Sequence, residues 1–126
     1  MWKTILVGYD GSEHSKDALS KAEKIAEQGN SKILIVNVYR EMITKSFSQG
    51  LLEEAEETLA PELEVEKVSA RNTDVVEELL EIAEVEGADL VVVGSRGMGE
   101  AASVLLGSVS HGVATGSEVD VLITHK

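Results

Sequence analysis

The chain has 126 residues and no cysteine, a length that fits one domain (residues 1–126) whose core needs no disulfides. Its formal net charge of −12 argues against general binding to nucleic acid, which requires a basic face. No stretch approaches the roughly 20 apolar residues that span a membrane, and the N-terminus begins a strand pattern rather than a signal peptide, so we expect a cytoplasmic protein with neither a nucleic-acid nor a membrane partner.

Strand and helix patterns alternate along the whole chain. Strands are indicated by short runs of apolar and β-branched residues, and helices by apolar residues that recur at a spacing of three or four. In chain order the expected elements are a strand at 3–9, a helix at 13–28, a strand at 32–39, a helix at 50–59, a strand at 64–70, a helix at 74–86, a strand at 89–93, a helix at 108–115 and a strand at 119–125. Such alternation predicts an α/β domain in which a parallel sheet is covered by helices on both faces.

Local signals mark several of the expected boundaries. Ser12 is a good N-cap for the first helix, and Gly29 is a natural stop for it. Asp74, with Glu77 three residues later, makes a capping-box pattern at the start of the third helix. Residues 40–49 are polar with little periodicity, so we expect a loop there. The alternation of apolar and polar residues in the third strand indicates a half-exposed strand at the edge of the sheet.

Two loops are candidates for a binding site. In parallel α/β sheets, ligands bind beyond the carboxyl ends of the strands, where the winding direction switches. The loop after the first strand carries Asp10, Gly11 and Ser12, and the loop after the fourth strand begins at Gly94. These two loops face each other if the first and fourth strands are neighbours in the sheet.

The loop from Gly94 to Ser110 is rich in small residues. Gly94, Gly97 and Gly107 allow sharp turns and a close approach of the backbone to a ligand. A short helix is expected from Ser108, so its free N–H groups and the positive end of its dipole would face the loop. These features suit a phosphate group, and they also fit a flexible connection.

The ends of the strands carry a wider set of matching features. The first strand ends in Asp10-Gly11-Ser12, the second ends in Asn37-Val38-Tyr39, and the fourth runs from Asp89 to Gly94. A G-x2-G-x9-G-S pattern follows, formed by Gly94, Gly97, Gly107 and Ser108. With these features the chain resembles the universal stress protein family over essentially its whole length. The resemblance implies a doubly wound, five-stranded parallel sheet of order 3-2-1-4-5, a Rossmann-like fold of the adenine nucleotide alpha hydrolase type.

The resemblance also implies a site for an adenine nucleotide, ATP with Mg²⁺ or Mn²⁺. Asp10 would accept hydrogen bonds from the ribose hydroxyls, Val38 would offer its backbone N–H and C=O to the adenine edge, and Gly94 would let the ribose approach. The phosphates would lie among the donors that follow, with the metal bridging phosphate oxygens. The residues implied to bind the nucleotide are Asp10, Gly11, Ser12, Val38, Val93, Gly94, Arg96, Gly97, Gly107, Ser108, Val109 and Ser110.

Several of these residues also have simpler explanations. Asp10 could serve only as a helix cap or turn residue, and Ser108 and Ser110 could be N-terminal caps. Arg96 could clamp a phosphate or point into solvent. The histidines lack the spacing of metal ligands, so we expect all three to titrate at the surface; they are His14, His111 and His125.

The family resemblance implies a homodimer formed through the C-terminal strand, Val119 to His125. The chain departs from the family's pattern at Asp120, where members commonly have proline. Trp2, near the other end of the chain, is expected to pack at an edge.

These features together predict an ATP-binding stress protein that acts as a nucleotide-dependent sensor or switch. At most slow ATP hydrolysis is expected, because no general base with a positioned water can be assigned. One alternative is a homodimeric interaction module of the same fold that binds no nucleotide. Another is a dinucleotide-binding redox domain, because Gly97-Met-Gly99-Glu-Ala-Ala102 matches G-x-G-x-x-A. That fingerprint normally follows the first strand of its unit, and here it comes late in the chain.

Overall fold

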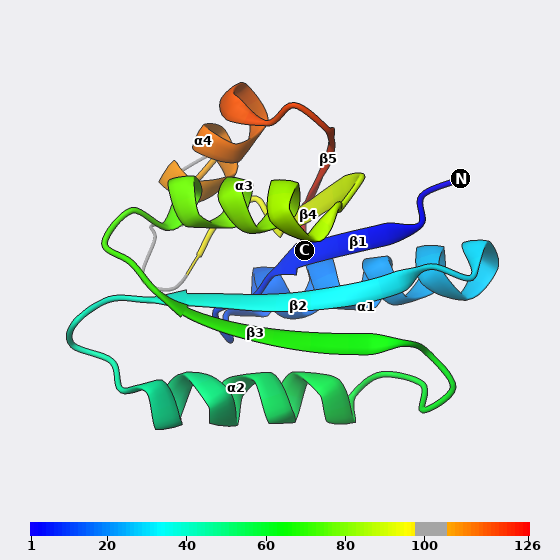
Figure 1. The fold of residues 1–126 in the computed structure, drawn as a ribbon, viewed down its shortest axis with the longest axis horizontal. Helices are drawn as coiled ribbons and strands as arrows, with labels where there is room; N and C mark the ends of the chain where they lie inside the picture. The colour runs from blue at the N-terminus through cyan, green and yellow to red at the C-terminus, as the bar shows by residue number, and fades with distance from the viewer. Residues whose placement is uncertain (98–105) are drawn as a thin grey trace.

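Helices and strands alternate along the chain in the computed structural model, which describes residues 1–97 and 106–126 (Figure 1). In chain order the elements are β1 (Thr4–Gly8), α1 (Glu13–Gly29), β2 (Lys32–Tyr39), α2 (Lys45–Glu57), β3 (Val65–Arg71), α3 (Val75–Glu86), β4 (Leu90–Gly94), α4 (Ser108–Gly116) and β5 (Asp120–Thr124). Within the described ranges, no helix combines the length and the apolar character that crossing a membrane requires.

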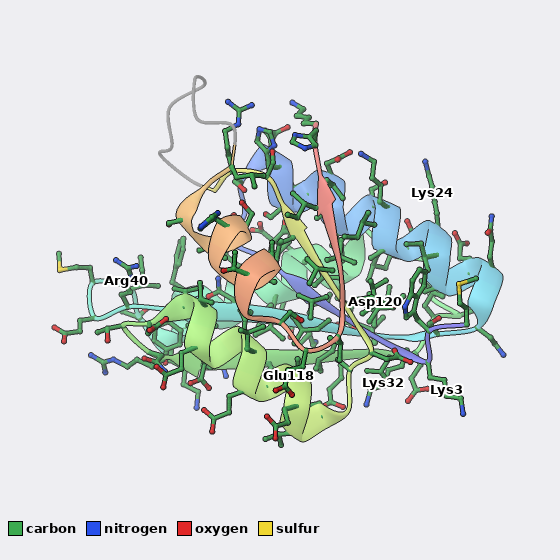
Figure 2. All side chains as sticks on the ribbon, turned by 90° about the horizontal axis from the view of Figure 1, so that it is seen from above. Lys3, Lys24, Lys32, Arg40, Glu118 and Asp120 are labelled. Carbon is green, nitrogen blue, oxygen red and sulfur yellow. The ribbon has the colours of Figure 1, made fainter. Side chains whose placement is uncertain are left out.

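The strands form one parallel sheet in the order β3-β2-β1-β4-β5, which confirms the order implied by the family resemblance. β1 pairs with β2 from Thr4 opposite Lys32 to Gly8 opposite Val36, and β2 then continues beyond the end of β1. Figure 2 shows Lys3 and Lys32 at one end of the molecule and Arg40, which follows β2, at the other. The carboxyl ends of the strands therefore gather at the end marked by Arg40.

Two hydrophobic clusters cover the two faces of the sheet. One packs beneath α1 and α2, and the other beneath α3 and α4. Figure 1 accordingly shows α2 on the opposite side of the sheet from α3 and α4. Successive residues of β1 serve different clusters, since Ile5 and Val7 belong to the first and Leu6 to the second. Burial on both faces explains why the central strands are uninterrupted apolar runs.

The second helix begins earlier than expected, at Lys45 instead of Gly50, so the expected loop over residues 40–49 is wrong for its second half. Thr44 caps the helix, because its hydroxyl accepts the backbone N–H of Phe47 at 3.0 Å. The first turns reverse the usual pattern, with Ser48 fully buried and the Phe47 side chain 57% exposed. A polar residue on the inner face and an aromatic residue on the outer face conceal the helical periodicity.

The caps of the other helices largely follow the sequence signals. Ser12 caps α1 as expected, since its hydroxyl accepts the N–H of Ser15 at 3.1 Å. The helix runs through Gly29 and ends at Asn30, which adopts a left-handed conformation with φ 57°. Asp74 accepts the N–H of Glu77 at 3.0 Å, which confirms the first half of the capping box. The N–H of Asp74 itself is bonded to the Asn72 side chain, so Glu77 does not complete the motif there.

β3 and β5 form the two edges of the sheet. β3 lies at one edge and is only partly buried along its length. β5 lies at the other edge, where Trp2 packs against the cluster beneath α1 and α2. The indole N–H of Trp2 donates to the Asp120 carboxylate at 2.9 Å. Edge packing of Trp2 is therefore confirmed, and Asp120 has a specific partner at the start of β5.

Candidate functional site

A cleft lies where β1, β2 and β4 end, and α3 and the start of α4 complete its walls. Its empty volume, including solvent at the mouth, is ≈ 500 Å³. The order of the strands reverses at β1, because β2 lies on one side of it and β4 on the other. Ligands of open α/β sheets bind at such a reversal, so the fold itself favours this position for a site.

The cleft brings together residues of both loops that the sequence singled out, because β1 and β4 are neighbours. The lining residues that were expected to bind nucleotide are Asp10, Val38, Val93, Gly94, Arg96, Gly97, Val109 and Ser110. The other expected residues are outside the described lining: Gly11, Ser12, Gly107 and Ser108. Of these, Ser108 instead borders a second hollow together with Arg40 and Thr73.

Part of the lining was not predicted from the sequence. Those residues are Gly8, Tyr9, Ser15, Val36, Asn37, Val75 and Leu79. Val75 and Leu79 belong to the apolar stripe of α3. The periodicity of the sequence does not distinguish residues of this stripe that line a cleft from those that pack in the core. With Val36, Val38 and Val93, these two α3 residues make one side of the cleft apolar, as a planar aromatic ring requires.

The backbone of Val38 presents both a donor and an acceptor to this cleft. Along a strand, the N–H and C=O groups of successive residues point to opposite sides. The Val36 carbonyl accepts the N–H of Tyr9 on the β1 side at 2.9 Å, and the Tyr39 carbonyl accepts the N–H of Asn72 on the β3 side at 3.1 Å. The N–H and C=O of Val38 therefore point toward the β1 side, where β1 has already ended.

Asp10, in the lining of the cleft, is held by a tight turn. Its carboxylate accepts the N–H of Ser12 at 2.9 Å, and its own N–H lies 3.3 Å from the Ser15 hydroxyl. Gly11, between them, has φ +84°, a conformation that other residues adopt only with strain. This explains Gly11 and Ser12 through the turn and the helix cap, and it fixes the direction of the Asp10 carboxylate.

The two described ends of the glycine-rich loop are fastened to each other. The Ser95 carbonyl accepts the N–H of Gly107 at 2.6 Å and the Ser110 hydroxyl at 2.8 Å. The Ser110 hydroxyl also lies 3.1 Å from the Gly107 carbonyl, so it already serves the backbone. Gly107 is the N-cap of α4, and the first N–H groups of the helix have no acceptor within it. A partial positive charge therefore lies beside the cleft at Val109 and Ser110.

The model of the Universal stress protein family matches residues 1–125 of this sequence. The chain belongs to the universal stress protein family. A universal stress protein of Thermus aquaticus is 33% identical over 135 residues, covering 98% of this chain and 98% of its own. One of Bacillus subtilis is 33% identical over 147 residues, covering 98% of this chain and 99% of its own. A solved structure described as a universal stress protein in complex with cAMP superimposes with a TM-score of 0.81 at 34% identity, covering 98% of this chain and 97% of that one.

In this universal stress protein, Gly94 has a packing role that its place in the glycine pattern does not reveal. A Cβ atom at position 94 would lie 2.7 Å from the carbonyl carbon and from the Cβ of His14 in α1. His14 was expected at the surface, but it is half-buried there, with Nδ1 3.3 Å from the Ser95 hydroxyl. His111 and His125 are exposed, as expected.

Two other predictions concern metal and dinucleotide binding. Among residues 1–97 and 106–126, no group of three or more histidine or carboxylate side chains is placed to hold a metal ion. The fingerprint Gly97 to Ala102, on which the less favoured dinucleotide-binding alternative rests, lies outside the described residues except for Gly97.

Proposed function

We propose that this universal stress protein binds an adenine nucleotide in the cleft at the ends of β1, β2 and β4, and that ATP with Mg²⁺ or Mn²⁺ is its ligand. The observation that carries the proposal is the Val38 backbone edge, which faces an apolar cleft. An N–H next to a C=O matches the N1 acceptor and the N6 donor of adenine. The apolar side of the cleft would cover one face of the ring.

The polar groups of the cleft suit the rest of the nucleotide. The Asp10 carboxylate, in the lining of the cleft, is a natural acceptor for ribose hydroxyls. Arg96 and the start of α4 supply positive charge for phosphate, which the net charge of −12 would otherwise repel. A divalent cation bound mainly through phosphate oxygens would reduce that repulsion further. The relative solved with cAMP, 34% identical to this chain, shows that an adenine nucleotide suits a member of the family.

The role we infer is that of a nucleotide-dependent switch: bound nucleotide changes the surface offered to a partner in a stress response. We also propose that two copies associate through β5. The Thr124 carbonyl accepts the N–H of Ser95, which follows β4, so the backbone groups of Val121 and Ile123 point outward along the sheet edge. Light scattering should give a dimer for the parent protein and a monomer for Ile123→Lys.

The first experiment is to denature freshly purified protein and to identify any released small molecule by chromatography and mass spectrometry. Titration of nucleotide-free protein with Mg-ATP, AMP and cAMP in a calorimeter then gives the affinities.

Gly107→Val should abolish binding, since its side chain would occupy the space for phosphate. The fold should survive, because φ −72° and ψ 170° are allowed for valine.

A matched control is Gly50→Ala, since an added Cβ there has nothing within 4 Å. Its affinity should equal that of the parent protein. The proposal is refuted if the parent protein neither releases nor binds an adenine nucleotide, or if Gly107→Val binds one with unchanged affinity.

A further inference from the structure

A series of hydrogen bonds between polar side chains links three elements at the cleft. Asn37, 5% exposed at the end of β2, donates from Nδ2 to the Tyr9 carbonyl at 2.7 Å. Its Oδ1 accepts the Ser48 hydroxyl of α2 at 2.6 Å, and the Ser48 and Ser69 hydroxyl oxygens are 2.7 Å apart. Asn37 also contributes to the lining of the cleft.

The donor and the acceptor of each hydrogen bond in this series follow from the group at its end, the Tyr9 carbonyl. A backbone carbonyl can only accept, so the group of Asn37 that faces Tyr9 must be its NH₂. Its oxygen therefore faces Ser48 and takes the one hydroxyl proton that Ser48 can donate. Ser48 can then only accept from Ser69. The series thus runs in one direction, from Ser69 through Ser48 and Asn37 to the Tyr9 carbonyl.

The Tyr9 carbonyl is the group that would otherwise continue the pairing of β1 with β2. With Gly8 opposite Val36, a regular parallel ladder would next join the Tyr9 carbonyl to the N–H of Val38. In this structure the Asn37 amide takes that acceptor instead. The strands part at this point, and the Val38 N–H keeps its direction into the cleft.

We propose that Asn37 is a positioning residue of the nucleotide site: its amide holds the Tyr9 carbonyl, ends the pairing of β1 with β2, and so keeps the Val38 backbone edge available to adenine. The inference rests on the proposed function for its ligand. The effect of Asn37 on the pairing of β1 with β2 can be measured in protein that carries no ligand. Asn37 acts through Tyr9 and Val38, and its own contact with the nucleotide is not required.

Asn37→Asp tests the donor by changing one group at constant shape. At pH 8 the carboxylate can still accept from Ser48 but has nothing to donate to Tyr9, so affinity for AMP should fall at least about fivefold. As the pH falls to 5.5 the buried acid takes up a proton and regains a donor, so the ratio of mutant to parent affinity should rise toward one. Because AMP changes its own charge with pH in the same way for both proteins, comparing the mutant with the parent at each pH removes that effect from the affinity ratio.

Asn37→Thr removes the amide without adding a charge, and its side chain is one bond shorter. Affinity should fall at every pH, and in nucleotide-free protein the Val38 N–H should exchange more slowly, because the Tyr9 carbonyl becomes its partner. Loss of structure alone would speed exchange there. The matched control is Ser31→Ala, which removes a buried hydroxyl bonded to the Trp2 carbonyl at the opposite end of β2. It should lower stability and leave AMP affinity unchanged.

The inference is overturned if the Asn37→Asp affinity ratio is near one or does not change with pH, or if Val38 in Asn37→Thr exchanges as fast as in the parent or faster. Should the parent protein bind no adenine nucleotide, the proposed function fails separately. Exchange at Val38 then still decides whether Asn37 keeps the strands apart.

Discussion

Replacing Gly94 by alanine should destabilise the protein even when no ligand is present. The added Cβ would lie 2.7 Å from the carbonyl carbon of His14, 2.7 Å from its Cβ and 2.8 Å from its carbonyl oxygen. Two of these atoms belong to the backbone of α1, so a change of rotamer cannot relieve the contact. The start of α1 would have to move away from β4, and with it the hydrogen-bonded pair of His14 and Ser95.

The size of the effect follows from the cost of overpacking. Forcing one extra carbon into a closely packed site costs about 1–3 kcal/mol. For a chain of 126 residues, the unfolding entropy makes about 1 kcal/mol equivalent to a change of roughly 4 °C in Tm. We therefore expect Gly94→Ala to lower Tm by about 4–12 °C.

Urea unfolding and thermal scans of nucleotide-free protein measure this loss directly. The control is again Gly50→Ala, in the interior of α2, where an added Cβ meets nothing within 4 Å. There the substitution should stabilise by about 0.5–1 kcal/mol, because alanine is the better helix former. If Gly94→Ala were as stable as the parent protein, the packing of α1 against β4 would not be the reason for glycine at this position.

Two further predictions concern contacts outside the lining of the cleft. A Cβ at Gly112 of α4 would lie 2.7 Å from Cγ2 of Val76 in α3, so Gly112→Ala should cost about 1–2 kcal/mol, and Val76→Ala in the same chain should recover most of it; strictly additive losses in a double-mutant cycle would contradict this. Although burial acts to raise it, bonds from the Lys3 and Thr4 N–H groups hold the pKa of the Asp89 carboxyl below its ordinary value. This carboxylate therefore stabilises the fold above about pH 4 and loses its effect as the pH falls through the lowered pKa. Asp89→Ala should cost about 1.5 kcal/mol or more at neutral pH and less at pH 2.5 in urea titrations; an equal cost at both values would disprove the linkage.

Much of the fold could be predicted from periodicity, because the central strands are buried on both faces. The run from Lys32 to Tyr39 gave the bounds of β2 as the structure has them. The order of the strands could not be obtained in this way, since no local pattern tells which strands pair. That order depends on contacts between distant residues, such as the Asp89 carboxylate with the Lys3 and Thr4 N–H groups, and it was available only from the family resemblance.

The candidate site divides in the same manner. Asp10 and Val38 could be proposed from the motifs at the ends of β1 and β2, and both line the cleft. Asn37 stands next to Val38 in the same run, yet its role depends on where β1 stops relative to β2. A polar residue in an apolar strand is the signal that could have drawn attention to it. Its partners are Tyr9, which follows β1, and Ser48 in α2, and the sequence alone does not show that these segments lie beside Asn37.

The glycines of the G-x2-G-x9-G-S pattern therefore answer two different physical demands. At Gly94 the demand comes from α1, because any side chain would meet the backbone of His14. At Gly107 the backbone conformation is one that every residue can adopt, so the dihedral angles do not call for glycine there. The demand at Gly107 is then expected to come from the ligand. A Gly94 variant that loses binding is therefore informative about the site only if its free energy of unfolding equals that of the parent protein. A Gly107 variant that loses binding at parental stability reports directly on the position of the phosphate.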